Sequence, residues 1–92
     1  MSSDSFADLG FQVSHIAGIS RAWYREYADG SFVLITDVEG FDLPESGGPW
    51  QGSYLSRQND LIELAPIFYE AKDLVEWIEH IERLSHRIQL RK

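Results

Sequence analysis

The sequence predicts a single α+β domain in which an antiparallel sheet of four to five strands packs on one C-terminal amphipathic helix. Three observations predict this fold. Residues 21–38 contain two runs of aromatic and β-branched residues around an Asp-Gly pair, and residues 53–65 contain two further short runs around a polar turn. From Glu70 onward the apolar period changes from two residues to about 3.6, which is typical of a helix.

Length and composition limit the class of protein. Ninety-two residues, 43% of them hydrophobic, suffice for one packed core but not for two. We assign residues 1–10 to a flexible N-terminal arm, with one short helical turn as the alternative, and residues 11–92 to the domain. The chain has no cysteine, which excludes disulfides and thiolate metal sites. It also shows neither a basic leader nor a run of about 20 apolar residues, so we expect a cytoplasmic protein outside the membrane.

The first hairpin is predicted to turn at Asp29 and Gly30, because both residues tolerate positive φ angles. A two-residue loop would put Trp23 on the same face as Leu34. A three-residue loop with a bulge at Gly30 would instead put Trp23 with Ile35, since a shift of one residue exchanges the faces. The sequence leaves both registers open. It also leaves open a first strand within residues 11–19, where apolar residues alternate only loosely.

Residues 39–52 are predicted to form a long loop, with four glycines, two prolines and three acidic residues in fourteen positions. Connections of this length are often functional or disordered. The second hairpin follows, with strands over residues 53–57 and 61–65. Pro66 ends its second strand or places that strand at an edge of the sheet, because proline cannot donate a ladder hydrogen bond.

The C-terminal helix is predicted from Glu70 onward. Acidic Glu70 and Asp73 near its start, and basic Arg87 and Arg91 near its end, suit the helix dipole. Its apolar residues fall on one stripe that a sheet must cover. The stripe consists of Leu74, Trp77, Ile78, Ile81, Leu84 and Ile88.

Charge argues against direct nucleic-acid binding. The net charge is −7, and eleven of the fifteen carboxylates precede residue 71, together with only three of the eight basic residues. Affinity for phosphate backbones comes from clustered Lys and Arg. We attribute the basic residues at the end of the helix to the helix dipole rather than to a binding patch. They are Arg83, Arg87, Arg91 and Lys92.

No catalytic residue, cofactor site or metal site is predicted. His80 and His86 project about 240° apart around a helix, so they cannot share a metal ion. We interpret Glu76 with His80, and Glu82 with His86, as salt bridges on the helix face, and we give His15 a structural role. An acidic cluster lacks the spacing of a calcium-binding loop and is interpreted as a solvated loop. That cluster comprises Asp37, Glu39, Asp42 and Glu45.

Aromatic residues and a glycine-rich segment give the candidate contacts with a partner or ligand. Trp50 lies in a glycine-rich segment, residues 47–52, and either folds back onto the core as a lid or anchors a partner. The aromatic area exceeds what one helix covers, so the second sheet face must meet solvent, the N-terminal arm or another molecule. The candidate contact residues are Trp50, Gly48, Gln51, Trp23, Tyr24 and Tyr54.

Three functions fit these features. The first is a non-enzymatic protein-interaction module that uses the open sheet face and the glycine-rich segment, with a homodimer as one form of it. The second is a small-ligand-binding protein or minor enzyme whose pocket lies between helix and sheet, floored by Trp23 or Tyr24 and closed by Trp50. The third is an acidic mimic of nucleic acid that occupies a basic groove on another protein. The sequence by itself does not decide among them.

Overall fold

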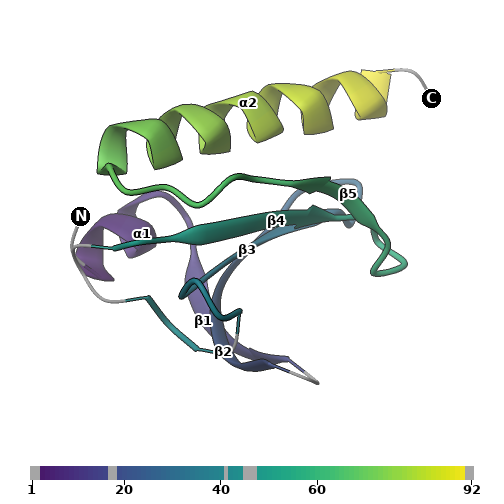
Figure 1. Ribbon diagram of the computed structural model, residues 1–92. Coiled ribbons are helices and arrows are strands. Elements are labelled where there is room, and N and C mark those ends of the chain that lie inside the picture. The colour runs from purple at the N-terminus through teal and green to yellow at the C-terminus, as the bar shows by residue number, and fades with distance from the viewer. Residues whose placement is uncertain (1–2, 17–18, 41, 45–47, 91–92) are drawn as a thin grey trace.

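The computed structural model describes residues 3–16, 19–40, 42–44 and 48–90. Within them the chain forms one antiparallel sheet with the strand order β1-β2-β3-β4-β5 and two helices (Figure 1). The elements are α1 (Ser3–Asp8), β1 (Gln12–Ile16), β2 (Ile19–Glu26), β3 (Phe32–Thr36), β4 (Gln51–Leu55), β5 (Leu61–Leu64) and α2 (Ala71–Leu90). The predicted fold class is therefore confirmed.

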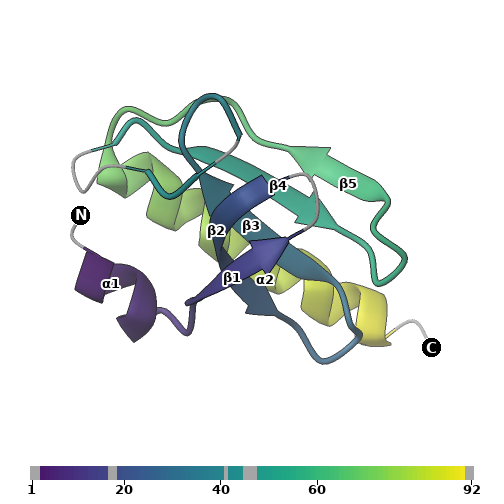
Figure 2. The same ribbon diagram turned by 90° about the horizontal axis from the view of Figure 1, so that it is seen from below.

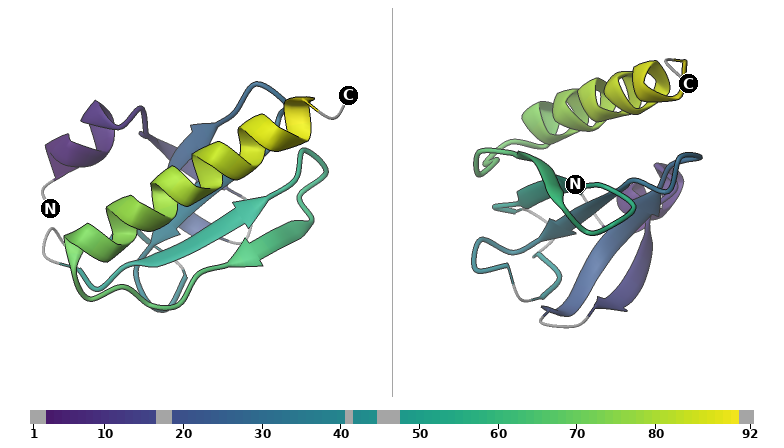
Figure 3. Two further views of the ribbon diagram at one scale, coloured as in Figure 1. Left: turned by 90° about the horizontal axis from the view of Figure 1, so that it is seen from above. Right: turned by 90° about the vertical axis from the view of Figure 1, so that its right-hand side faces the viewer.

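Helix α2 lies on one face of the sheet, and α1 lies at the side of the sheet next to the start of β1 (Figure 1 and Figure 2). In Figure 1, α2 forms a layer above β4 and β5, while β1 and β2 curl away from it. Seen from above, α2 runs obliquely over the sheet, with α1 on one side of it and β5 on the other (Figure 3). The view from below shows the strands crossing in front of α2 (Figure 2). None of the helices among the described residues is apolar over a length that could span a bilayer.

The first hairpin has the three-residue loop. Trp23 pairs with Ile35 across β2 and β3. In the loop, the Tyr27 amide donates to the Ser31 carbonyl at 2.8 Å, and the Gly30 amide donates to the Tyr27 carbonyl at 2.9 Å. Gly30 has a φ of 88°, a conformation that glycine adopts at little cost, so the loop can close with a bulge at this residue. The register expected for a two-residue loop does not form.

The N-terminal segment contributes to the core. The short helix expected as the alternative is present as α1. It places Phe6 against Trp23, with the ring centroids 5.3 Å apart. The first strand, which the sequence left open, is also present. β1 pairs with β2 through Gln12 opposite Tyr24 and Val13 opposite Trp23, so Trp23 lies at the junction of α1, β1 and β2.

The predicted loop over residues 39–52 extends too far. Gln51 and Gly52 belong to β4, where Gly52 lies opposite Ile35 of β3. Glycine has a low intrinsic preference for strands, and here the pairing with β3 overrides it. The second hairpin lies where it was predicted, although β4 ends at Leu55, before the turn closed by the Ser56 amide and the Asp60 carbonyl at 2.8 Å.

The main core lies between the sheet and the helices. Four residues of the predicted helix stripe are buried in it and Leu84 is half-buried, while the side chain of Ile88 lies outside the described residues. The core comprises Phe6, Phe11, Trp23, Val33, Ile35, Trp50, Tyr54, Ala65, Phe68, Leu74, Trp77, Ile78 and Ile81.

The opposite face of the sheet has a smaller core. Ala22, Phe32 and Leu34 are buried there, with Tyr24 and Leu55 packed against them. Our expectation of an open second face is therefore wrong at its centre. The curl of the sheet allows this face to bury part of its own apolar area, so its exposed apolar side chains lie at its edge rather than at its centre.

Candidate protein-interaction surface

Exposed hydrophobic side chains gather along β5 and the segment that follows it. Seven large hydrophobic residues of the described chain are exposed, and five of them lie between residues 61 and 69; the other two are Val13 and Val38. Isolated exposed apolar residues are ordinary, whereas a larger exposed apolar patch favours an interaction site. The five residues here are close neighbours along the chain. We call this group the β5 surface. It consists of Leu61 (56% exposed), Ile62 (43%), Leu64 (60%), Ile67 (38%) and Tyr69 (74%).

The exposure follows from the position of β5 at the edge of the sheet. β5 pairs only with β4, so in the described structure one side of its backbone has no strand partner. Glu63 faces Tyr54 and Leu61 faces Leu55, which leaves Ile62 as an extra residue at a register shift. Such irregularities are common on edge strands. Here the edge remains apolar, and an edge of this kind is suited to pairing with another chain.

A groove continues the β5 surface toward α2. It has a volume of about 590 Å³ and is lined by residues 66–70 together with four residues of α2. Its floor is aromatic, because Phe68 and Trp77 are mostly buried there with ring centroids 5.9 Å apart. Reciprocal backbone hydrogen bonds of 2.9 Å to Trp50 hold Phe68 in place. The groove therefore has a fixed apolar base.

Carboxylates surround this floor. Glu70, Asp73 and Glu76 line the groove. Beside it, one carboxylate oxygen of Glu63 accepts a hydrogen bond of 2.7 Å from the indole Nε1 of Trp77, and the other lies 3.3 Å from Nε2 of His80. The expected helix-face pair of His80 with Glu76 is thus replaced by a contact with β5. The sequence could not indicate this contact, because Glu63 and His80 meet only through the packing of α2 on the sheet.

The aromatic residues predicted as contacts are mostly structural. Trp50 and Tyr54 are 1% and 0% exposed, and Trp23 is also buried, so all three belong to the main core. Trp50 has folded back as a lid, which was one of its two interpretations. Gly48 and Gln51 are half-buried. The Gln51 amide group donates to the carbonyl oxygen of Ala65 at 2.8 Å, so it supports the end of the second hairpin.

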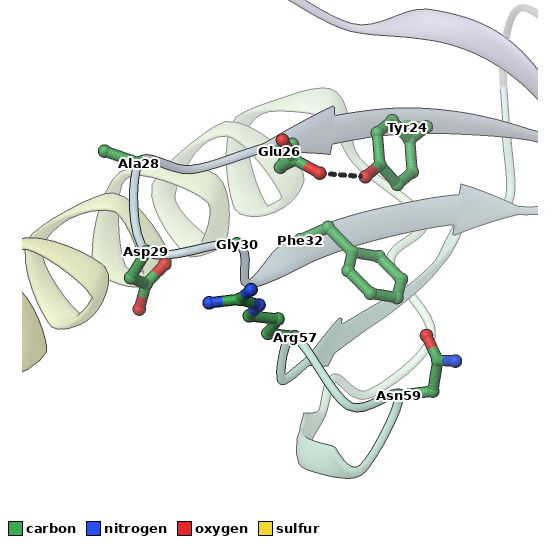
Figure 4. A pocket seen from close by; sticks show the side chains of 8 residues that line it. All are labelled: Tyr24, Glu26, Ala28, Asp29, Gly30, Phe32, Arg57 and Asn59. Atoms are coloured by element: carbon green, nitrogen blue, oxygen red, sulfur yellow. Dashed lines mark hydrogen bonds between the residues drawn. The ribbon is translucent and has the colours of Figure 1, made fainter.

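Tyr24 lies on the opposite side of the sheet from Trp50, because its neighbour Trp23 points into the core that contains Trp50 and successive side chains of a strand point to opposite faces. The structure therefore separates Tyr24, one of the two floors proposed for a pocket between helix and sheet, from the lid Trp50, whereas Trp23, the other floor, is buried in the same core as Trp50. Tyr24 instead lines a hollow of about 440 Å³ between the two hairpin turns (Figure 4). Its hydroxyl donates to Glu26 at 2.8 Å, and burial together with this bond raises the pKa of Tyr24 to about 12.

The acidic loop is tied to the sheet by an ion pair. Arg21 Nε lies 2.8 Å from Oδ1 of Asp42, and this hydrogen bond holds the pKa of Asp42 below its ordinary value. Glu45 lies outside the described residues. Across the described part of the chain, histidine and carboxylate side chains form no group of three or more that could hold a metal ion.

The fold and this surface define a small acidic α+β domain with an apolar sheet edge beside an acidic groove. No protein-family profile, curated protein or solved structure matches the chain. Sequence reasoning did not identify the β5 surface, although one signal pointed to it. Ile67 and Tyr69 follow Pro66 and fit neither the strand period nor the helix stripe, so neither period gives them a place in the core.

Proposed function

We propose that the protein is a non-enzymatic protein-interaction module that binds a partner through the β5 surface. The observation that carries this proposal is the concentration of exposed hydrophobic side chains on an edge strand and the segment after it. Each exposed leucine or isoleucine that a partner covers contributes on the order of 1 kcal/mol of binding free energy. Such an edge is costly to retain unless it is used, because it also promotes aggregation.

The mode of binding that suits this surface is strand addition. An extended segment of the partner would pair with the outer backbone of β5 and cover its apolar side chains. Backbone hydrogen bonds then supply affinity, while the side-chain positions along the edge supply specificity. The aromatic floor formed by Phe68 and Trp77 would receive a side chain at the end of this segment.

The proposal is tested by comparing the proteins captured from the native cells by three tagged forms. The wild type is compared with the double variant Ile62→Ser/Leu64→Ser. The matched control, Val13→Ser/Val38→Ser, changes the two exposed apolar residues outside the surface. We expect the wild type and the control to recover the same partner, and the β5 variant to lose it. Equal recovery by all three forms would contradict the proposal.

Self-association is the second form that this function can take. Light scattering after size exclusion measures the mass of the wild type and of the Ile62→Ser/Leu64→Ser variant. A dimeric wild type and a monomeric variant would identify a second copy of the chain as the partner. Thermal melting of the same samples verifies that the variant remains folded, as expected for changes at exposed positions.

A further inference from the structure

We propose that the occupant of the β5 surface is an extended, positively charged segment of a partner protein, in which apolar residues alternate with lysine or arginine. This inference rests on the proposed function and adds the chemistry of the partner. It follows from the two kinds of side chain that flank β5, apolar on one face and acidic on the other.

The two faces of β5 differ. Leu61 and Leu64 lie opposite Leu55 and Ser53, and therefore point to the sheet face that is turned away from α2. Glu63 points to the other face, where it contacts Trp77 of α2. A strand added beside β5 alternates in the same way. One row of its side chains would cover the leucines, and the other row would project toward the side of α2.

The side of α2 that borders the segment after β5 is acidic. Glu70, at the start of the helix, and Asp73 and Glu76, within it, line the groove, and His80 is the only basic residue in the lining. None of these three carboxylates forms an ion pair with a described residue. With Glu63 of β5, four carboxylates therefore lie along the groove and the edge strand that leads to it. Cationic side chains complement them, and they also increase the rate of association.

The same charges argue against a second copy of the chain as the occupant. Each copy carries a net charge of −7, so two copies repel each other at low ionic strength. A cationic segment is attracted over the same distance. The net charge by itself identifies no partner. Together with the apolar edge, it favours a cationic segment over a second copy of the chain.

Titration of the isotopically labelled full chain with synthetic peptides, followed by NMR, tests the inference. The probes are an eight-residue peptide that alternates valine with lysine, its glutamate counterpart, and a lysine peptide with proline at alternate positions to block strand pairing. We expect the lysine peptide to shift the amide signals of Ile62 and Leu64 and to bind at least about tenfold more tightly than either other peptide. A rise in salt from about 50 to about 500 mM should weaken this binding, because exposed charges are screened.

Matched variants separate the groove from the overall charge. Asp73→Asn/Glu76→Gln removes two exposed carboxylates at the groove, and Asp8→Asn/Glu39→Gln removes two exposed carboxylates elsewhere. The groove variant should bind the lysine peptide about fivefold or more weakly, and the control within about twofold of wild type. Equal weakening by both pairs would overturn the inference, since the peptide would then sense only the net charge.

The outcomes for the two proposals are distinguishable. If the lysine peptide binds no better than the glutamate peptide while the β5 variant still loses a captured partner, the cationic segment is wrong and the interaction module stands. If the light-scattering measurement instead shows a dimer that depends on Ile62 and Leu64, the occupant is a second copy. If the peptides show no preference and all tagged forms capture the same proteins, both proposals fail.

Discussion

Gly52 and Trp77 pack so closely that a Cβ atom on Gly52 would lie 2.6 Å from Cζ3 of the Trp77 ring. Because Gly52 has no side chain, the indole of Trp77 lies directly on β4 at this position. Held there, Trp77 donates its Nε1 hydrogen to Glu63 of β5 and forms part of the groove floor. The glycine thus allows the close packing of α2 on β4 that leaves Trp77 within hydrogen-bond distance of Glu63.

Gly52→Ala should therefore destabilise the fold. The added methyl group collides with a large ring in a packed interior, and overpacking of this kind costs about 1–3 kcal/mol. Urea unfolding measures the loss, with Ser53→Ala, at the neighbouring position on the opposite face, as the control. Equal midpoints for the two variants would show that the contact with Trp77 is not a close one.

The hydrogen bond between Glu63 and Trp77 should contribute to stability as well as to the shape of the groove. Glu63→Ala removes the acceptor for the indole and should lower the free energy of unfolding by about 1 kcal/mol. Glu63→Gln keeps an acceptor oxygen and should lose less. Chemical denaturation of both variants measures the difference, and an identical loss would show that only the charge of Glu63 matters.

A buried hydroxyl chain closes the first hairpin. The Tyr54 hydroxyl donates to Ser31 Oγ at 2.9 Å, and Ser31 in turn donates to Asp29. Ser31→Ala should cost about 1–3 kcal/mol, because it leaves a buried phenol without an acceptor. Tyr54→Phe in the same chain should recover part of that loss. A double-mutant cycle measures the coupling between the two residues, and additive losses would contradict it.

Stability should fall at alkaline pH in part because of Tyr27. Burial raises the pKa of Tyr27 to about 12, and its buried hydroxyl has no hydrogen-bond partner in the described structure. The unfolded chain ionises first, near the ordinary phenol pKa of about 10. The contribution of Tyr27 is therefore fully present below about pH 10 and is lost as the pH rises toward about 12.

Tyr27→Phe should reduce this alkaline loss. At neutral pH it should leave stability unchanged or raise it by up to about 1 kcal/mol, because it removes a buried polar group that has no partner. Unfolding free energies at about pH 7 and about pH 11 measure both effects. Tyr69→Phe, at a residue that is 74% exposed, is the control and should retain the wild-type pH dependence. Tyr24 also has a raised pKa, so part of the loss should remain.

The sequence determined the elements whose signals are local. The stripe from Leu74 to Ile81 identified α2 and the face that it buries, because the helical period places those residues together wherever the helix lies. The turn residues around Gly30 located the first hairpin and limited its register to two choices. The choice between them required the structure, because it depends on which side chains α1 and α2 cover.

The functional surface was decided by tertiary structure. In the sequence Leu61 and Leu64 belong to a predicted strand and Trp50 has two interpretations, and the structure exposes the leucines and buries Trp50. Trp50 is buried because Phe68, distant in the sequence, pairs with it, and the leucines are exposed because β5 is the last strand of the sheet. The type of a side chain determines how much free energy its burial contributes. Whether it is buried depends on neighbours that only the folded chain brings together.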